Sequence, residues 1–306
     1  MAVLALGDPA YPMRLRTIPD PPPVLFVRGA LDASPAVAII GSRRATPYGL
    51  AAAARLAADL AMARVTVISG LARGIDGAAH QAALDGGGRT IAVLGCGADV
   101  AYPPEHRALA GAIAASGALV SEFAPGTPPL RGHFPRRNRL ISGLALGVVV
   151  VEGMEDSGAL VTVDYALDQG REVFAVPGSI FSRHSRAPHE LLRQGARVVE
   201  SAADVLHELG LAAAPERSGQ VEGAGAGQPD DHRSGADRET RLLSLLESGP
   251  RSRDDIVTVS GWPAGDVAAL ISMLEIRGLI RTLPGQMVMR TLGPGGSHTR
   301  RRGERA

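Results

Sequence analysis

The sequence contains no lysine, so all 32 of its basic residues are arginines. They are balanced by 31 acidic residues, and the formal net charge of +1 excludes a generally cationic, polyanion-binding surface. Any affinity for nucleic acid must therefore come from local clusters of arginine. The planar guanidinium group suits both bidentate phosphate contacts and stacking.

Cysteine is also scarce, since Cys96 is the single one. This excludes an intramolecular disulfide framework and cysteine-rich zinc sites, and the histidines show no metal-ligand spacing. The N-terminus has no basic-then-apolar signal segment, and the longest apolar run, near Leu140 to Val151, is too short to span a bilayer. We expect a soluble cytoplasmic protein with no membrane association, metal or cofactor.

The central part of the chain alternates strand-like and helix-like segments. Helical patterns occupy Pro47–Ala63 and Ile75–Asp85. The strand-like segments are Val37–Ile40, Val65–Ser69, Thr90–Gly95, Ala118–Phe123, Val148–Glu152, Glu172–Gly178 and Arg197–Ser201. Because these strands are almost entirely apolar, they indicate a mostly parallel sheet covered on both faces. The fold class is therefore α/β, with a Rossmann-like, doubly wound domain.

Composition divides the rest of the chain. Residues 1–35 are proline-rich and predict an extended arm before the Rossmann-like domain of residues 36–211. Residues 212–236 have the composition of a flexible linker. Residues 237–292 predict three helices and a hairpin, the pattern of a small C-terminal winged-helix domain. Residues 293–306 predict a disordered basic tail.

Several predicted strands end in glycine and hydroxyl residues, directly before a helix. In a doubly wound sheet such loops meet at the carboxyl edge, where backbone N–H groups and hydroxyls can bind phosphate. Each loop by itself is also explained by a tight turn. The residues concerned are Gly41, Ser42 and Arg43 in one loop, Ser69 and Gly70 in a second, Gly95 and Gly97 in a third, and Ser157 and Gly158 in a fourth.

The segment RGHFPRRNR, Arg131 to Arg139, places one of only five phenylalanines within a dense run of arginines. No Asp or Glu occurs between Phe123 and Val151. We interpret the segment as a loop in which arginines follow phosphates while Phe134 stacks on a base, as single-stranded nucleic-acid binding requires. The alternative is a solvated charged loop with Phe134 in the core, and the segment alone does not decide between the two.

The motifs GSRRATPYG, SGLARGIDGAAH, SEFAPGTPPLRGHFPRRNRLISGL and VVVVEGMEDSGALVTVDYAL together resemble those of the DNA-processing protein A (DprA/Smf) family. The resemblance implies a single-stranded DNA-binding protein of natural transformation that protects incoming strands and loads the RecA recombinase. It also implies a homodimer and contact with single-strand-binding protein. The DNA-binding residues that it implies are Gly41, Ser42, Arg43, Ser69, Gly70, Arg131, Phe134, Arg137, Asn138, Arg139, Ser157 and Gly158.

The sequence departs from the family pattern in three places. Asp156 stands where a basic residue is common, and His106 replaces the asparagine of a Tyr-Pro-x-x-Asn motif. Ala187, Pro188 and His189 replace a Gly-Thr/Ser-Asn segment. Asp156 would weaken one wall of a DNA-binding groove.

Two other classes of function match the sequence less well. A nucleotide-processing enzyme of a related fold would carry a PGG-x-GT-x-x-E segment, which is absent, and Asp76 and Glu122 are explained by helix and loop structure. We therefore expect no enzymatic activity. A duplex-DNA regulator would use the helix from Pro263 to Gly278, whose single cation is Arg277. Protein contact suits that helix better.

Overall fold

In the computed structural model, residues 1–211, 235–246, 251–277, 279–283 and 287–290 are described. They fall into two compact units, one within Met1–Gln220 and the other within Val221–Ala306. The expected linker, apart from residues 235 and 236, and the expected basic tail lie outside the described residues.

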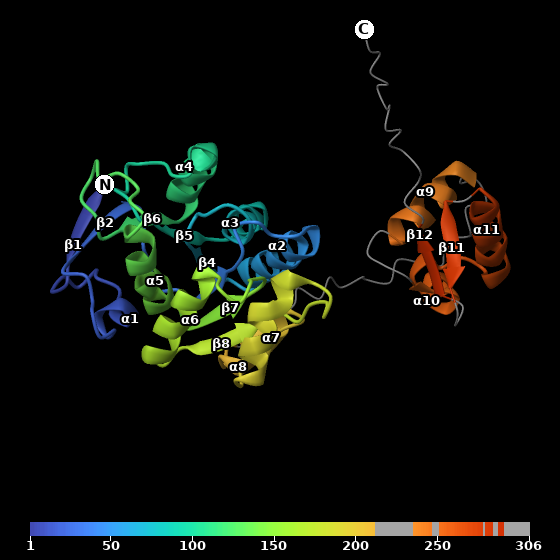
Figure 1. Cartoon of the computed structure of the whole chain (residues 1–306). Coiled ribbons are helices and arrows are strands. Elements are labelled where there is room, and N and C mark those ends of the chain that lie inside the picture. Colours follow the sequence, from blue (N-terminus) through green and yellow to red (C-terminus); the bar gives the residue numbers. More distant parts are fainter. Residues whose placement is uncertain (212–234, 247–250, 278, 284–286, 291–306) are drawn as a thin grey trace, which may run out of the picture. The chain divides into compact units, whose positions relative to one another are not determined.

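The first unit is built on a nine-stranded sheet with the order β1-β2-β6-β5-β4-β3-β7-β8-β9 (Figure 1). The strands from β6 to β9 along this order pair in parallel, and β1 and β2 continue the sheet antiparallel beside β6. The strand bounds are β1 Ala2–Ala5, β2 Val24–Gly29, β3 Ala36–Ile40, β4 Thr66–Ser69, β5 Thr90–Val93, β6 Ala118–Ser121, β7 Gly147–Val150, β8 Glu172–Ala175 and β9 Arg197–Val198.

Helices cover both faces of this sheet, as the apolar strands predict. One face packs against α2, α3 and α8 around Val67 and Phe174, with α4 nearby, and the other packs against α1, α5, α6 and α7 around Ile68 and Leu140. The helix bounds are α1 Met13–Arg16, α2 Pro47–Met62, α3 Ile75–Asp85, η1 Pro104–His106, α4 Arg107–Ser116, α5 His133–Leu144, α6 Gly158–Asp168, η2 Arg183–Ser185, α7 Arg186–Arg193 and α8 Ala202–Glu208. The doubly wound α/β class is confirmed.

The proline-rich N-terminal segment is more than the expected extended arm. Strand β2 pairs with β6, and β1 pairs with β2, so residues 2–29 add two strands to the central sheet. Tyr11, Leu15 and Leu25 are buried in the same apolar core as α5. The segment joins the domain because these side chains bury apolar area there, which the proline content of the sequence concealed.

The second unit contains three helices and a small three-stranded sheet with the order β10-β12-β11. Its elements are α9 Gly235–Leu245, β10 Arg251–Ser252, α10 Arg253–Ser260, α11 Ala264–Ile276, β11 Ile280–Leu283 and β12 Met287–Arg290. Leu242, Ile256, Ile271 and Val288 bring the helices and the sheet together in one core. The predicted three helices and hairpin are therefore present.

No single helix of the described residues is long and apolar enough to cross a membrane. One bent pair, Arg253–Ser260 with Ala264–Glu275, meets the criteria of length and composition together, with an angle of 118° between its helices.

Candidate nucleic-acid interface

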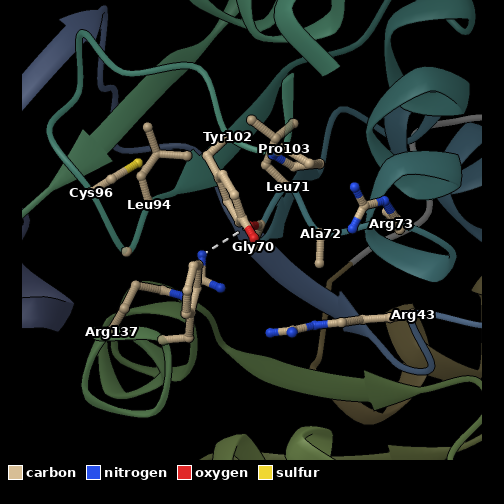
Figure 2. A pocket seen from close by; sticks show the side chains of 12 residues that line it. Arg43, Gly70, Leu71, Ala72, Arg73, Leu94, Cys96, Tyr102, Pro103 and Arg137 are labelled. Carbon is tan, nitrogen blue, oxygen red and sulfur yellow. Dashed lines mark hydrogen bonds between the residues drawn. The ribbon is translucent and has the colours of Figure 1, made fainter. Parts of the chain in front are cut away.

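A pocket opens at the carboxyl edge of the sheet, above the ends of β3, β4 and β5 (Figure 2). Polar and aromatic side chains from four segments far apart in the sequence meet there. The lining residues are Arg43, Gly70, Leu71, Ala72, Arg73, Leu94, Gly95, Cys96, Tyr102, Pro103, Phe134 and Arg137. Carboxyl ends of parallel strands are where ligands of doubly wound proteins bind.

The Phe134 ring forms one wall of this pocket and remains half-buried. The Arg43 guanidinium carbon lies 5.5 Å from its centroid, and the Tyr102 ring lies 5.6 Å away at an interplanar angle of 38°. The ring approaches the backbone of Gly95 so closely that a Cβ there would lie 2.9 Å from Phe134 Cδ1. Glycine at position 95 therefore allows the ring its place in the pocket.

Arg137 lies on the same helix, one turn after Phe134, and is only 3% exposed. Its Nη1 donates to the Gly70 carbonyl oxygen at 2.9 Å and also to the Val93 carbonyl oxygen. Burial lowers the pKa of Arg137 to about 10, with Asp76 acting in the opposite direction and the charge of Arg43 adding to the lowering. Figure 2 shows the Arg43 and Arg137 side chains extending toward one another across the pocket.

Asp76 stabilises the loop at Gly70 through hydrogen bonds to its backbone. Its Oδ2 accepts from the Gly70 N–H at 3.1 Å and from the Ala72 N–H at 3.2 Å. Burial raises the pKa of this carboxyl, and the nearby Arg137 lowers it. Gly70 itself has no room for a side chain, since a Cβ would lie 2.6 Å from Arg137 Nη2.

The segment from Arg131 to Arg139 is not a loop as expected. From His133 onward it forms the first turns of α5, with Pro135 in the first turn, where its missing N–H is tolerated. Helical geometry separates its arginines onto different faces. Arg131 and Arg136 are exposed, whereas Arg137 and Arg139 are buried.

Arg139, which was expected to contact phosphate, does not line this pocket. Its Nη1 and Nη2 donate to the two carboxylate oxygens of Glu122 at 2.7 and 2.9 Å, and its Nε donates to Asp20 Oδ2 at 3.1 Å. Arg136 also pairs with Glu122, at 3.1 Å. Glu122 lies just outside the acid-free segment in sequence, whereas Asp20 comes from the N-terminal segment. Both carboxylates hold Arg139 within the fold.

The other expected phosphate-binding residues surround the pocket without lining it. Ser69 is buried and donates to the Ile39 carbonyl oxygen, and Ser42 Oγ accepts from the Arg44 N–H. Gly41 packs against the backbone of Glu152. At the start of α6, Ser157 Oγ caps the helix, and Asn138 Nδ2 donates to the Gly158 carbonyl oxygen at 3.4 Å.

Four of the DNA-binding residues implied by the family resemblance thus line the pocket, namely Arg43, Gly70, Phe134 and Arg137, together with Gly95 of the third predicted loop. Tyr102 and Arg73 also line it, and neither was expected from the sequence. Arg73 lies in the SGLARGIDGAAH motif and Tyr102 in the Tyr-Pro-x-x-Asn motif, so proximity to the glycines of the same loops was the available signal.

The departures from the family pattern are accommodated locally. His106 Nδ1 lies 3.1 Å from the Leu71 carbonyl oxygen, beside the pocket. Ala187 N donates to the Gly153 carbonyl oxygen, and His189 Nε2 lies 3.0 Å from the Gly178 carbonyl oxygen. Asp156 is exposed, next to Ser157.

Comparison with known proteins identifies the chain. Residues 2–210 match the family described as DNA recombination-mediator protein A, and residues 226–286 match the DprA winged helix domain. The chain belongs to the DprA/Smf family. Protein Smf of Escherichia coli is 41% identical over 289 residues, covering 91% of this chain and 74% of that protein. DNA processing protein DprA of Bacillus subtilis is 43% identical over 220 residues, covering 71% and 72%.

Solved DprA structures share the fold of the first unit. DprA from Streptococcus pneumoniae has a TM-score of 0.66 and 44% identity, covering 68% of this chain and 74% of its own. DNA processing protein A from Helicobacter pylori, whose structure concerns its single-stranded DNA binding mode, has a TM-score of 0.61 and 29% identity over 68% of this chain and 96% of its own. The DprA/Smf family and the Rossmann-like fold with a winged-helix domain are thus both confirmed.

Proposed function

We propose that this protein binds single-stranded DNA through the pocket at the carboxyl ends of β3, β4 and β5. A base stacks on Phe134, and the adjoining phosphates contact Arg43 and are attracted by the positive charge of Arg137. The observation that carries this proposal is the half-buried ring with the Arg43 guanidinium 5.5 Å from its centroid. A stacking face beside cations is what sequence-tolerant single-strand binding needs.

The electrostatics of the pocket favour an anion. Among the described residues that line it there is no carboxylate, while Arg43, Arg73 and Arg137 all contribute to its wall. Arg73 is paired with Glu105, so Arg43 and the buried Arg137 supply the positive charge. A phosphate would relieve the repulsion between these two guanidinium groups.

The same geometry favours a single strand over a duplex. The bases of a duplex are stacked on one another and paired, so a base reaches an aromatic wall only after it leaves the stack. A single strand already presents unstacked bases. Phe134 can therefore discriminate against duplex DNA without reading sequence.

Family membership extends the proposal to partners. The relative from Helicobacter pylori is described by its single-stranded DNA binding mode, which supports the same ligand here. We also propose that this protein protects incoming single strands during natural transformation and loads the RecA recombinase onto them. It would do so in the cytoplasm as a homodimer, in contact with single-strand-binding protein.

A binding role without catalysis is supported by the chemistry of the pocket. Its described lining residues include no imidazole or carboxylate that could act as a general base. Burial raises the pKa of the Cys96 thiol to about 11, which disfavours the nucleophilic thiolate.

The proposal is tested by fluorescence anisotropy of a labelled oligonucleotide, single-stranded against duplex, across a range of salt concentrations. Phe134→Ala should lose about 1–3 kcal/mol of single-strand affinity, and Phe134→Trp should retain it. Arg43→Ala should reduce the slope of log K against log[salt] by about 0.7 for each phosphate that Arg43 neutralises.

Arg55→Ala is the matched control for Arg43→Ala, because Arg55 is exposed on α2 and paired with Asp59. It should leave both affinity and salt slope unchanged. Equal affinity for single strand and duplex, with no effect of Phe134→Ala, would refute the proposal.

The winged-helix unit is proposed to contact protein rather than duplex DNA. Arg277, at the end of α11, is paired with Glu239 at 2.9 Å, and Asp266 in the first turn pairs with Arg238. The cation that a duplex-DNA regulator would use is therefore already paired within the unit. Arg277→Glu in the full chain should leave duplex binding unchanged by the anisotropy assay.

A further inference from the structure

A turn after β8 carries the most exposed aromatic side chain of the described residues. Phe181 is 91% exposed, and its neighbour Ile180 is 75% exposed. Among the described residues no ring or cation is paired with the Phe181 ring. An aromatic face of this size is therefore left entirely to solvent.

The turn that carries this ring is well braced. The Ser182 N–H donates to the Ser179 carbonyl oxygen at 3.0 Å, and the Phe181 N–H donates to Ser179 Oγ at 3.3 Å. At its base, Tyr48 Oη donates to the Pro177 carbonyl oxygen at 2.6 Å. A Cβ on Gly178 would collide with Ser185, so close packing also holds the base of the turn. The ring is thus presented by a defined structure.

Two arginines follow the Phe181 ring in the sequence. Arg183 and Arg186 are both exposed on the segment that follows. Arg186 Nη1 lies 3.7 Å from Glu155 Oε1, a long ion pair, whereas the Arg183 side chain has no such partner among the described residues. The turn therefore offers an exposed aromatic ring with exposed arginines close by in sequence.

A groove lies between β3 and β8, on the path from the Phe134 pocket to this turn. It is lined by Thr46, Tyr48, Glu152, Pro177, Gly178, Ser179, Ser182 and Ser185. The strand order turns back between β3 and β7, the switch point where doubly wound sheets bind ligands. Strands β4 and β8 are three strand spacings apart in the sheet, so a ligand that reaches both strand ends must span about 14 Å.

One acidic group faces this groove. Glu152 is 2% exposed, and its two carboxylate oxygens accept from the Thr46 N–H and the Thr46 hydroxyl. The carboxylate is therefore hydrogen-bonded within the protein. Arg43 and Arg44, in the loop that follows β3, are exposed and could contact phosphate.

We propose that Phe181 is a second base-stacking platform, and that one DNA strand runs along the carboxyl edge of the sheet from Phe134 to Phe181. This inference rests on the proposed single-strand binding at Phe134. A protein partner is less well matched, because the two exposed apolar side chains at the tip are followed in sequence by serine and arginine.

The test is the affinity of the full chain for oligothymidines of increasing length, from about 4 to about 16 nucleotides. A strand that reaches both rings should bind more tightly than one that reaches only Phe134. Phe181→Ala should remove that gain, a loss of about five- to fiftyfold for long strands, and leave the shortest strands unaffected. Ile180→Ala is the matched control, because it removes exposed apolar area at the same tip without removing a π face.

Phe181→Trp gives an independent readout, because the second tryptophan should lose fluorescence when a base stacks on it. Unchanged affinity of Phe181→Ala at every length, or an equal loss with Ile180→Ala, would overturn the inference. So would a fall in the molar mass of Phe181→Ala by light scattering, since the ring would then pack against a second copy of the chain. If the wild type binds no single strand at all, it is the proposed function that fails.

Discussion

Arg137 and Arg139 lie two residues apart on α5, and both are almost fully buried, yet their surroundings differ. Arg139 forms ion pairs with the carboxylates of Glu122 and Asp20. Arg137 donates to the carbonyl oxygens of Gly70 and Val93 and forms no ion pair among the described residues. Burial lowers the pKa of both, but hydrogen bonding and charge from Glu122 more than offset it for Arg139, whose pKa is raised overall.

The difference shows which cations of an arginine-rich segment can serve a ligand. The charge of Arg139 is cancelled within the protein, so it contributes to the fold. The charge of Arg137 is compensated mainly by carbonyl dipoles and the nearby Asp76, so a positive potential remains at the pocket. Buried groups with incompletely compensated charge are candidates for function on this physical ground.

The largest expected effect comes from breaking the Arg139 pair. Arg139→Ala leaves the buried Glu122 carboxylate without its main partner and should cost about 3–5 kcal/mol of unfolding free energy. Urea unfolding followed by far-ultraviolet circular dichroism measures this. Tryptophan fluorescence would not, because the single Trp262 belongs to the other unit.

Arg136→Ala is the control for that measurement. Its side chain is 61% exposed and also touches Glu122, so it should cost no more than about 1 kcal/mol. Equal costs for the two variants would mean that burial does not distinguish these arginines.

A second test uses His80, which is buried behind the pocket. Burial, reinforced by the charges of His106 and Arg137, lowers its pKa to about 3. The unfolded chain, with a pKa near 6.5, therefore binds a proton that the folded chain excludes between these two values. Stability should fall as the pH falls through this window, by up to about 1.4 kcal/mol per pH unit, or about 2 kcal/mol from pH 6.5 to 4.5.

His80→Asn isolates this contribution, because asparagine can still bond to Thr90 Oγ1, which lies 2.6 Å from His80 Nδ1. The variant should show a shallower loss of stability than the wild type in urea titrations between pH 6.5 and 4.5. His207→Asn, on an exposed position of α8, should follow the wild type. Identical pH profiles for all three proteins would contradict the lowered pKa of His80.

Much of the fold could be predicted from the sequence, because strand and helix periodicity is local information. Seven strands of the sheet, and the helices from Pro47 and Ile75, lie within a few residues of their predicted bounds. The N-terminal strands could not be predicted this way. The pairing of β2 with β6 depends on a partner almost one hundred residues away, and the prolines nearby favoured an extended arm.

The candidate site was predicted in part. The glycine-rich loops and Phe134 were found because doubly wound topology brings strand ends together, whatever the detailed packing. The ion pair of Arg139 could not be predicted, because its partner Glu122 lies just outside the acid-free segment and approaches only when α5 packs beside the end of β6. Side-chain pairing across elements was the information that the sequence lacked.

Asp76→Asn tests the difference between Arg137 and Arg139, because it leaves the positive charge of Arg137 less compensated. The substitution removes the nearby negative charge, while the amide oxygen can still accept from the Gly70 and Ala72 N–H groups. Single-strand affinity should rise by roughly 1 kcal/mol, about fivefold, at low salt. Anisotropy titrations measure it, with Asp85→Asn at the exposed end of α3 as the control. Weaker binding by a folded Asp76→Asn protein would show that Arg137 does not act on the ligand through its charge.

The smallest effect is expected from Gly95→Ala, which tests the ring rather than the charge. The new Cβ would lie 2.9 Å from Phe134 Cδ1, so the half-buried ring must tilt by a small amount. Single-strand affinity should fall by about 0.5–1 kcal/mol, less than the loss from removing the ring, with the salt slope unchanged because no cation moves. Gly132→Ala is the control, since a Cβ there meets nothing within 4 Å and the φ of −69° suits alanine. A change in salt slope with Gly95→Ala would mean that ring and cations cannot be separated, and that the pocket binds DNA as a single unit.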